Sequence, residues 1–85
     1  MLSEPIITID VHGMTVEKAL AAIHKKVNGA GKAVYEVRVI HGFHGGTRIR
    51  SAVRDEFGYG REPKVKRVQP GDNEGLTRLI LKELF

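Results

Sequence analysis

The architecture follows from a stretch near the start of the chain, Ile6-Ile7-Thr8-Ile9-Asp10-Val11-His12-Gly13. Its β-branched residues predict a strand over residues 6–11. A second stretch of the same kind also ends in histidine and glycine, and it runs Tyr35-Glu36-Val37-Arg38-Val39-Ile40-His41-Gly42. A segment with helical periodicity follows each stretch. Two successive strand–helix units predict parallel strands joined by right-handed crossovers, with the carboxyl ends of the strands at one ligand-binding edge of the sheet.

Two helices are predicted from the spacing of apolar residues. The apolar stripe of the first helix consists of Val16, Ala19, Leu20, Ile23 and Val27. Thr15 is its predicted N-cap, and Asn28-Gly29-Ala30-Gly31 is predicted to end it with glycine in the left-handed conformation. The second helix begins near Thr47, and its stripe consists of Ile49, Ala52, Val53 and Phe57.

The remainder of the chain is less regular. Val65 to Val68 is short and β-branched, which predicts a third strand that ends before Pro70-Gly71-Asp72-Asn73. The last segment, residues 76–84, fits either a helix or a strand, and its periodicity favours the helix. Residues 1–5 are expected to be a short tail, and residues 6–85 a single domain.

Side-chain alternation indicates that one face of the sheet is open. In the first strand, Thr8, Asp10 and His12 share one face, and the other face is aliphatic. The second strand alternates in the same way between valines and the charged pair Glu36 and Arg38. Strands covered by helices on both faces would be apolar throughout. We therefore expect both helices on one face and a partly basic open face suited to an extended anionic polymer.

Composition narrows the class of protein. The chain has 85 residues, no cysteine and a formal net charge of +4, and much of its basic excess lies between Arg48 and Arg67. The absence of cysteine excludes disulfides and thiolate chemistry. The first residues lack the pattern of a signal peptide, and no apolar run approaches the roughly 20 residues that a membrane span needs. The prediction is a cytoplasmic protein without a membrane partner.

Asp10 and His12 form the predicted catalytic pair. They lie two residues apart on a strand, so both side chains leave the same face. A carboxylate beside an imidazole can orient the ring for general acid–base catalysis. The same pattern also fits a strand end that bonds to its own loop. His41 has the opposite parity and is expected to be structural, whereas His24 is expected to take no part in function.

The glycine loop before the second helix is the predicted phosphate site, although the same residues could form a simple turn. Backbone N–H groups that precede a helix, together with the helix dipole, bind anions. The candidate residues are Gly42, His44, Gly45, Gly46, Thr47, Arg48 and Arg50. Arginine in a first helical turn costs about 0.3–1 kcal/mol against the dipole. A bound phosphate would offset that cost for both Arg48 and Arg50.

These motifs resemble those of the small MutS-related (Smr) domain family. The segment Ile9-Asp10-Val11-His12-Gly13-Met14-Thr15-Val16-Glu17-Lys18-Ala19 is similar to the family's Leu-Asp-x-His-Gly opening. The second strand, its His-Gly loop and Ile49-Arg50-Ser51-Ala52-Val53 resemble the second family motif. Residues 64–71 resemble the third strand and its turn, so the resemblance covers about residues 6–84.

The resemblance implies a βαβαββ two-layer α/β sandwich, similar to the C-terminal domain of bacterial translation initiation factor three. This fold would make the last segment a strand, and we follow it over the periodicity. The activity implied is nicking or cleavage of RNA or DNA, on the ribosome in some members. The loop differs from the family pattern, since Phe43 and His44 replace lysine and glycine.

Three functions are compatible with these observations. The favoured one is an endonuclease that cleaves RNA through histidine acid–base catalysis. The alternatives are a module that docks on nucleic acid or the ribosome without cutting, and a DNA-nicking endonuclease. No metal site or cofactor is predicted, because the spacing of His12, His41 and His44 matches no standard zinc motif. Mg²⁺ is the candidate ion if DNA is the substrate. The sequence leaves the oligomeric state open, with a monomer as the starting assumption.

Overall fold

The computed structural model describes residues 5–42 and 47–82. Its elements are β1 (Ile6–Asp10), α1 (Val16–Asn28), β2 (Glu36–Ile40), α2 (Arg48–Phe57), β3 (Arg67–Pro70) and β4 (Leu76–Ile80). The strands form one sheet in the order β1-β2-β4-β3. β1 and β2 are parallel, whereas β4 runs antiparallel to both β2 and β3. The predicted mixed sheet of the βαβαββ fold is confirmed.

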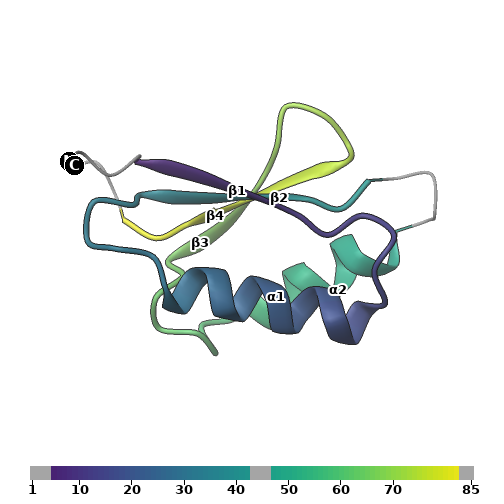
Figure 1. Cartoon of the computed structure of the whole chain (residues 1–85), viewed down its shortest axis with the longest axis horizontal. Helices are drawn as coiled ribbons and strands as arrows, with labels where there is room; N and C mark the ends of the chain where they lie inside the picture. The colour runs from purple at the N-terminus through teal and green to yellow at the C-terminus, as the bar shows by residue number, and fades with distance from the viewer. Residues whose placement is uncertain (1–4, 43–46, 83–85) are drawn as a thin grey trace.

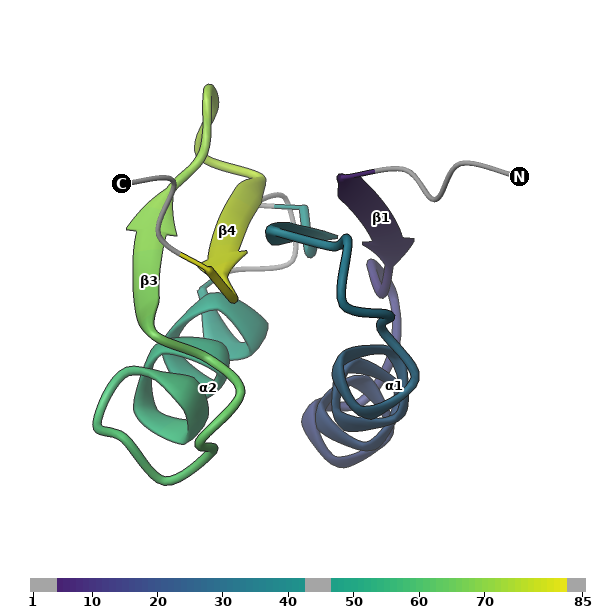
Figure 2. The same ribbon diagram turned by 90° about the vertical axis from the view of Figure 1, so that its left-hand side faces the viewer.

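Both helices pack on the same face of the sheet. Figures 1 and 2 show α1 and α2 side by side beneath the strands, with no helix of the described residues on the opposite face. This arrangement confirms the prediction of a two-layer sandwich with one open face.

Neither helix is long and apolar enough to cross a membrane.

The core lies between the sheet and the helices, and the alternation in the strands is the one predicted. Val37 and Val39 of β2 are fully buried, and Ile7 and Ile9 of β1 pack against the same cluster. The buried apolar residues of this cluster are Val11, Ala19, Ile23, Val27, Val34, Val37, Val39, Val53, Phe57, Val65, Leu79 and Leu81. Because each strand turns only one face toward this cluster, polar side chains at alternate positions are left on the open face.

The start of α1 agrees with the prediction, but the geometry of its end does not. The Thr15 hydroxyl accepts a hydrogen bond from the N–H of Lys18 at 3.2 Å, so Thr15 is the N-cap. A left-handed glycine was predicted within residues 28–31, but neither Gly29 nor Gly31 has a positive φ, and the φ of Gly29 is −86°. Its N–H still bonds to the carbonyl of Lys25, which continues the helical geometry by one residue. A Cβ on Gly29 would lie only 3.3 Å from that carbonyl oxygen, so close approach favours glycine there.

The segment that begins at Leu76 is a strand, as the family resemblance implied and the periodicity did not. Leu76–Ile80 forms β4 between β2 and β3, where Thr77 and Leu79 are fully buried. Alternation in this central strand therefore outweighs the helical spacing. The third strand is also displaced from its predicted bounds, since β3 covers Arg67–Pro70. Pro70 is tolerated because β3 is an edge strand.

Replacing Leu79 by alanine tests the central position of β4. Leu79 is fully buried, so the change should lower the free energy of unfolding by about 2–5 kcal/mol through lost burial and a cavity. Tyr59→Ala is the control, because Tyr59 is 75% exposed and should change stability by no more than about 0.5 kcal/mol. Urea denaturation followed by circular dichroism measures both. Equal losses in the two variants would contradict this placement of β4.

Candidate functional site

A tight turn after β1 positions His12. The N–H of Met14 bonds to the carbonyl of Val11 at 3.1 Å, and Gly13 occupies the third position of this turn with φ of +77°. Glycine is favoured there because a type II turn requires a positive φ at that position. The side chain of Val11 is fully buried and its N–H bonds to Ile40 of β2. With Val11 fixed in the core, the next side chain, His12, is turned out to the surface.

Asp10 and His12 interact directly, as the sequence predicted. Oδ1 of Asp10 accepts a hydrogen bond from the backbone N–H of His12 at 3.1 Å and is also bonded to Nδ1 of the His12 ring. Both side chains are exposed, 69% for His12 and 50% for Asp10. The hydrogen bonds from His12 hold the pKa of the Asp10 carboxyl below its usual value of 3.8. The contact leaves Nε2 as the ring nitrogen available to a ligand.

His41 is buried, and its contacts fit the structural role predicted for it. Its Nδ1 lies 2.8 Å from the carbonyl oxygen of Gly42, and its Nε2 lies 2.8 Å from the hydroxyl of Thr77. Thr77 belongs to β4, so the ring joins the end of β2 to the adjacent strand. With both nitrogens engaged and the residue 6% exposed, His41 has no free atom to offer a substrate.

The backbone of Gly42 lies beside His12. A Cβ on Gly42 would be 3.5 Å from the Cβ of His12, and the φ of Gly42 is +74°. The carbonyl of Gly75 accepts hydrogen bonds from the N–H groups of His41 and Gly42, at 2.9 and 3.1 Å. The side chain of Asn73 in turn accepts a bond from the N–H of Gly75 at 2.8 Å. The turn between β3 and β4 therefore fixes the start of the glycine loop.

Thr77 and Gly75 are residues that the sequence analysis missed. Their roles depend on β4 pairing with β2, which places Leu76 opposite Ile40 at the edge that carries the site. The helical periodicity of residues 76–84 concealed that pairing. The spacing of Leu79 and Leu81, which alternate with the polar neighbours Arg78 and Lys82, was the local signal for this strand, and the family resemblance was the other.

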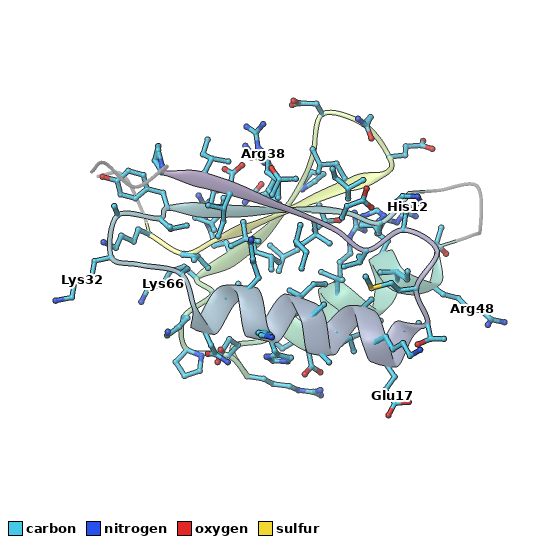
Figure 3. All side chains as sticks on the ribbon, in the orientation of Figure 1. His12, Glu17, Lys32, Arg38, Arg48 and Lys66 are labelled. Atoms are coloured by element: carbon cyan, nitrogen blue, oxygen red, sulfur yellow. The ribbon has the colours of Figure 1, made fainter. Side chains whose placement is uncertain are left out.

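The N-terminus of α2 has the predicted excess of positive charge. Arg48 and Arg50 lie in its first turn, which contains no acidic residue. Thr47 is the N-cap residue, and its side chain makes no capping hydrogen bond. Figure 3 shows Arg48 pointing outward at the same end of the molecule as His12. The other predicted loop residues, His44, Gly45 and Gly46, lie outside the described residues.

Basic residues lie at both ends of the molecule. Figure 3 places Lys66 and Lys32 at the end opposite His12 and Arg48. There they line a hollow of about 380 Å³ with Lys64 and Lys82. Lys64 donates to the carbonyl of Asn28 at 3.0 Å, and Lys82 donates to the carbonyl of Lys32. Lys64 thus satisfies the carbonyl of the last residue of α1, and Lys82 satisfies one in the loop that follows this helix.

His24 joins the two helices and does not reach the site. Its Nε2 lies 2.7 Å from a carboxylate oxygen of Glu56 on α2, and its ring centroid is 4.7 Å from that of Phe57. Within residues 5–42 and 47–82, no three or more histidines and carboxylates are grouped in a way that could hold a metal ion. The prediction about cofactors stays a prediction.

Together, the fold and site define a small two-layer α/β domain with an exposed Asp-His pair at the carboxyl edge of its parallel strands. The family model of the Smr domain matches residues 9–77, and the chain belongs to this family. Membership of this family indicates a nucleic-acid-binding module of the nuclease type.

A solved structure with the same fold is the Smr domain of Thermus thermophilus MutS2. It superposes with a TM-score of 0.78 at 23% sequence identity, over 89% of this chain and 98% of that one. A search of curated proteins gives no match.

The Asp10–His12 contact can be tested by titration. In the folded wild type, the Asp10 carboxyl should titrate below 3.8, because hydrogen bonds from His12 stabilise the carboxylate. His12→Ala removes the ring but keeps the backbone N–H, so the pKa of Asp10 should rise toward 3.8. Carboxyl ¹³C shifts measured against pH report both values.

Protonation of Asp10 at low pH also lowers the stability of the folded protein. Because folding lowers the pKa of Asp10, its contribution to stability is present above pH 3.8 and is lost as pH falls through the folded value. An Asp10 midpoint that is the same in both proteins would show that the ring does not contact the carboxylate in solution.

Gly42→Ala tests the backbone next to His12. A non-glycine residue at φ of +74° costs about 1–2 kcal/mol, and the added methyl group makes only ordinary contact with His12. Gly31→Ala is the matched control, since Gly31 has no positive φ and no atom within 4 Å of an added Cβ. Thermal unfolding measures the difference. A Gly31 variant that loses as much stability as the Gly42 variant would contradict the strain argument.

Proposed function

We propose that this Smr domain is an endoribonuclease that uses His12 as its acid–base group. The observation that carries the proposal is the exposed Asp10–His12 pair, in which Asp10 holds Nδ1 and leaves Nε2 facing solvent. A carboxylate that fixes the tautomer and orientation of an imidazole is the usual support for general acid–base catalysis. His41 supports the site as a structural residue, because both its nitrogens are already bonded.

The chemistry requires no group beyond the RNA and these side chains. Nε2 of His12 takes the proton from a 2′-hydroxyl, and the 2′-oxygen forms a bond to the adjacent phosphorus. The bond from phosphorus to the 5′-oxygen of the next nucleotide breaks, and that oxygen receives the proton. The products are a 2′,3′-cyclic phosphate and a 5′-hydroxyl end. Asp10 stabilises the transient imidazolium.

The start of α2 supplies positive charge for the phosphate. Arg48 and Arg50 and the uncapped amide groups of the first helical turn favour the dianionic transition state. The absence of an acidic residue from this turn supports the same role. The predicted loop residues Gly42, His44, Gly45 and Gly46 complete the proposed phosphate site.

The alternative is a module that binds nucleic acid or the ribosome without cleaving it. The observation in its favour is the replacement of the family's loop lysine and glycine by Phe43 and His44. A DNA-nicking enzyme is the third candidate, and it would require an activated water, with Mg²⁺ as the candidate ion. The His12→Ala variant separates a nuclease from a docking module, and the choice of RNA or DNA, with Mg²⁺ or EDTA, separates the two nucleases.

Cleavage of end-labelled RNA by wild type and His12→Ala tests the proposal. Removing the acid–base group should slow cleavage by about 100- to 10,000-fold. Binding of the same RNA should change by less than about threefold, because the proposed phosphate contacts come mainly from Arg48, Arg50 and the amide groups at the start of α2. His24→Gln is the control, since His24 bonds to Glu56 away from the site.

The conditions distinguish the rival functions. Wild-type cleavage in EDTA that leaves a cyclic phosphate end supports the proposed reaction. Cleavage of DNA alone, and only with Mg²⁺, would replace it by the nicking enzyme. Salt-sensitive binding without any cleavage would replace it by the docking module.

A further inference from the structure

The open face of the sheet carries two arginines side by side. The register aligns Thr8 of β1 with Arg38 of β2, and Arg38 in turn with Arg78 of β4. Arg38 and Arg78 are therefore directly opposite on an antiparallel pair. Like charges in that position destabilise a sheet. Figure 3 shows Arg38 pointing away from the helices, above the sheet.

One buried carboxylate serves both arginines. Oε2 of Glu36 accepts a hydrogen bond from Nε of Arg38 at 2.8 Å, and Oε1 lies 3.6 Å from Arg78. Glu36 is 8% exposed, whereas the side chains of the two arginines are 36% and 33% exposed. Nε of Arg78 is buried without a partner among the described residues. Asp72 also acts electrostatically on Arg38. Two guanidinium groups, each about one third exposed, thus lie beside one buried carboxylate, and one of them has an unpaired Nε.

Sheet stability does not require this arrangement. A cross-strand pair of threonines or β-branched residues would satisfy the same positions without an opposed charge. Two like charges that stay opposite each other on an accessible surface, against the preference of a sheet, are expected at a functional surface. Because the guanidinium group forms paired hydrogen bonds with phosphate oxygens, the arginines fit a phosphate backbone.

The cluster lies close to the Asp10–His12 pair. Thr8, the β1 partner of Arg38, precedes Asp10 by two residues on the same face. Two residues of a strand span about 7 Å. Ile40, the β2 partner of Asp10, lies between the two sites and is 36% exposed. A chain with alternating charged and apolar groups would meet the surface in the order His12, Ile40, Arg38.

We propose that the open face, through Arg38 and Arg78 held by Glu36, binds the phosphates of a single RNA strand adjacent to the one at His12. A base would lie against Ile40 between the two phosphates. This inference rests on the proposed function, because that function places the first phosphate at His12. It assigns a binding role to residues outside the Asp-His and glycine-loop motifs.

The test uses a triple variant that removes charge and keeps the polar groups. Glu36→Gln, Arg38→Gln and Arg78→Gln together lower the net charge by one and leave no buried charge unpaired. Lys25→Gln on α1 is the control, because it lowers the net charge by the same amount on the other side of the sheet. Both changes are made in the His12→Ala background, so that labelled single-stranded RNA stays intact during binding.

The triple variant should bind single-stranded RNA about tenfold more weakly, as expected when hydrogen bonds to a charged group are removed. The slope of log K against log salt should fall by about 0.7 for each phosphate that the variant no longer neutralises. Lys25→Gln should stay within about twofold of its parent. Circular dichroism and the melting temperature verify that each variant is folded.

A measurement on the parent variant, His12→Ala with Arg38 and Arg78 intact, holds even if the triple variant does not fold. The Nε–Hε NMR signals of Arg38 and Arg78 should shift on addition of RNA, whereas that of the exposed Arg61 should not. Unmoved Arg38 and Arg78 signals, or equal affinity of the triple and Lys25 variants, would overturn the proposal. Unchanged RNA affinity with lost binding of polyglutamate would assign the face to an acidic protein instead.

The binding of RNA to the open face and the nuclease activity can be refuted independently. If the wild type cleaves RNA through His12 but the triple variant binds RNA as tightly as its parent, the nuclease proposal stands and the role of the open face is overturned. If the triple variant binds RNA more weakly but the wild type cleaves none, the role of the open face stands and the nuclease proposal is overturned.

Discussion

Parallel pairing of β1 with β2 is the constraint that organises this molecule. Two adjacent parallel strands require a crossover, and α1 provides it on the face where the aliphatic residues lie. The same pairing sets the carboxyl ends of β1 and β2 next to each other, so the backbone of Gly42 comes to lie against His12. The position of the site is therefore a consequence of how the first two strands pair.

The two histidines that end these strands have different surroundings for a simple geometric reason. His12 follows Val11, whose burial turns the next side chain outward, whereas His41 shares the inward parity of Val37 and Val39. The inward ring meets Thr77, and its two nitrogens bond to the protein. A similar dipeptide thus supplies an exposed group at one strand end and a structural one at the other.

Electrostatic cost is concentrated at the surfaces to which we assign nucleic acid. The first turn of α2 carries arginines where the helix dipole disfavours them, and the open face sets two arginines opposite each other around Glu36. By contrast, Lys64 at the far end satisfies the carbonyl of Asn28, the last residue of α1, where positive charge is favourable. The net charge of the chain does not reveal this difference, because both ends of the molecule carry positive side chains.

Local patterns in the sequence were enough for β1, α1, β2 and α2, for the open face and for the Asp10–His12 contact, because each depends on residues close together along the chain. They were not enough for the end of the chain, where helical spacing in residues 76–84 competed with the alternation of Leu79 and Leu81 with polar neighbours. Insertion of β4 between β2 and β3 settles that competition, since a central strand gains partners on both edges. That long-range pairing also creates what no local pattern contains: the Thr77 bond to His41, the Gly75 carbonyl that fixes the glycine loop, and the opposition of Arg38 and Arg78.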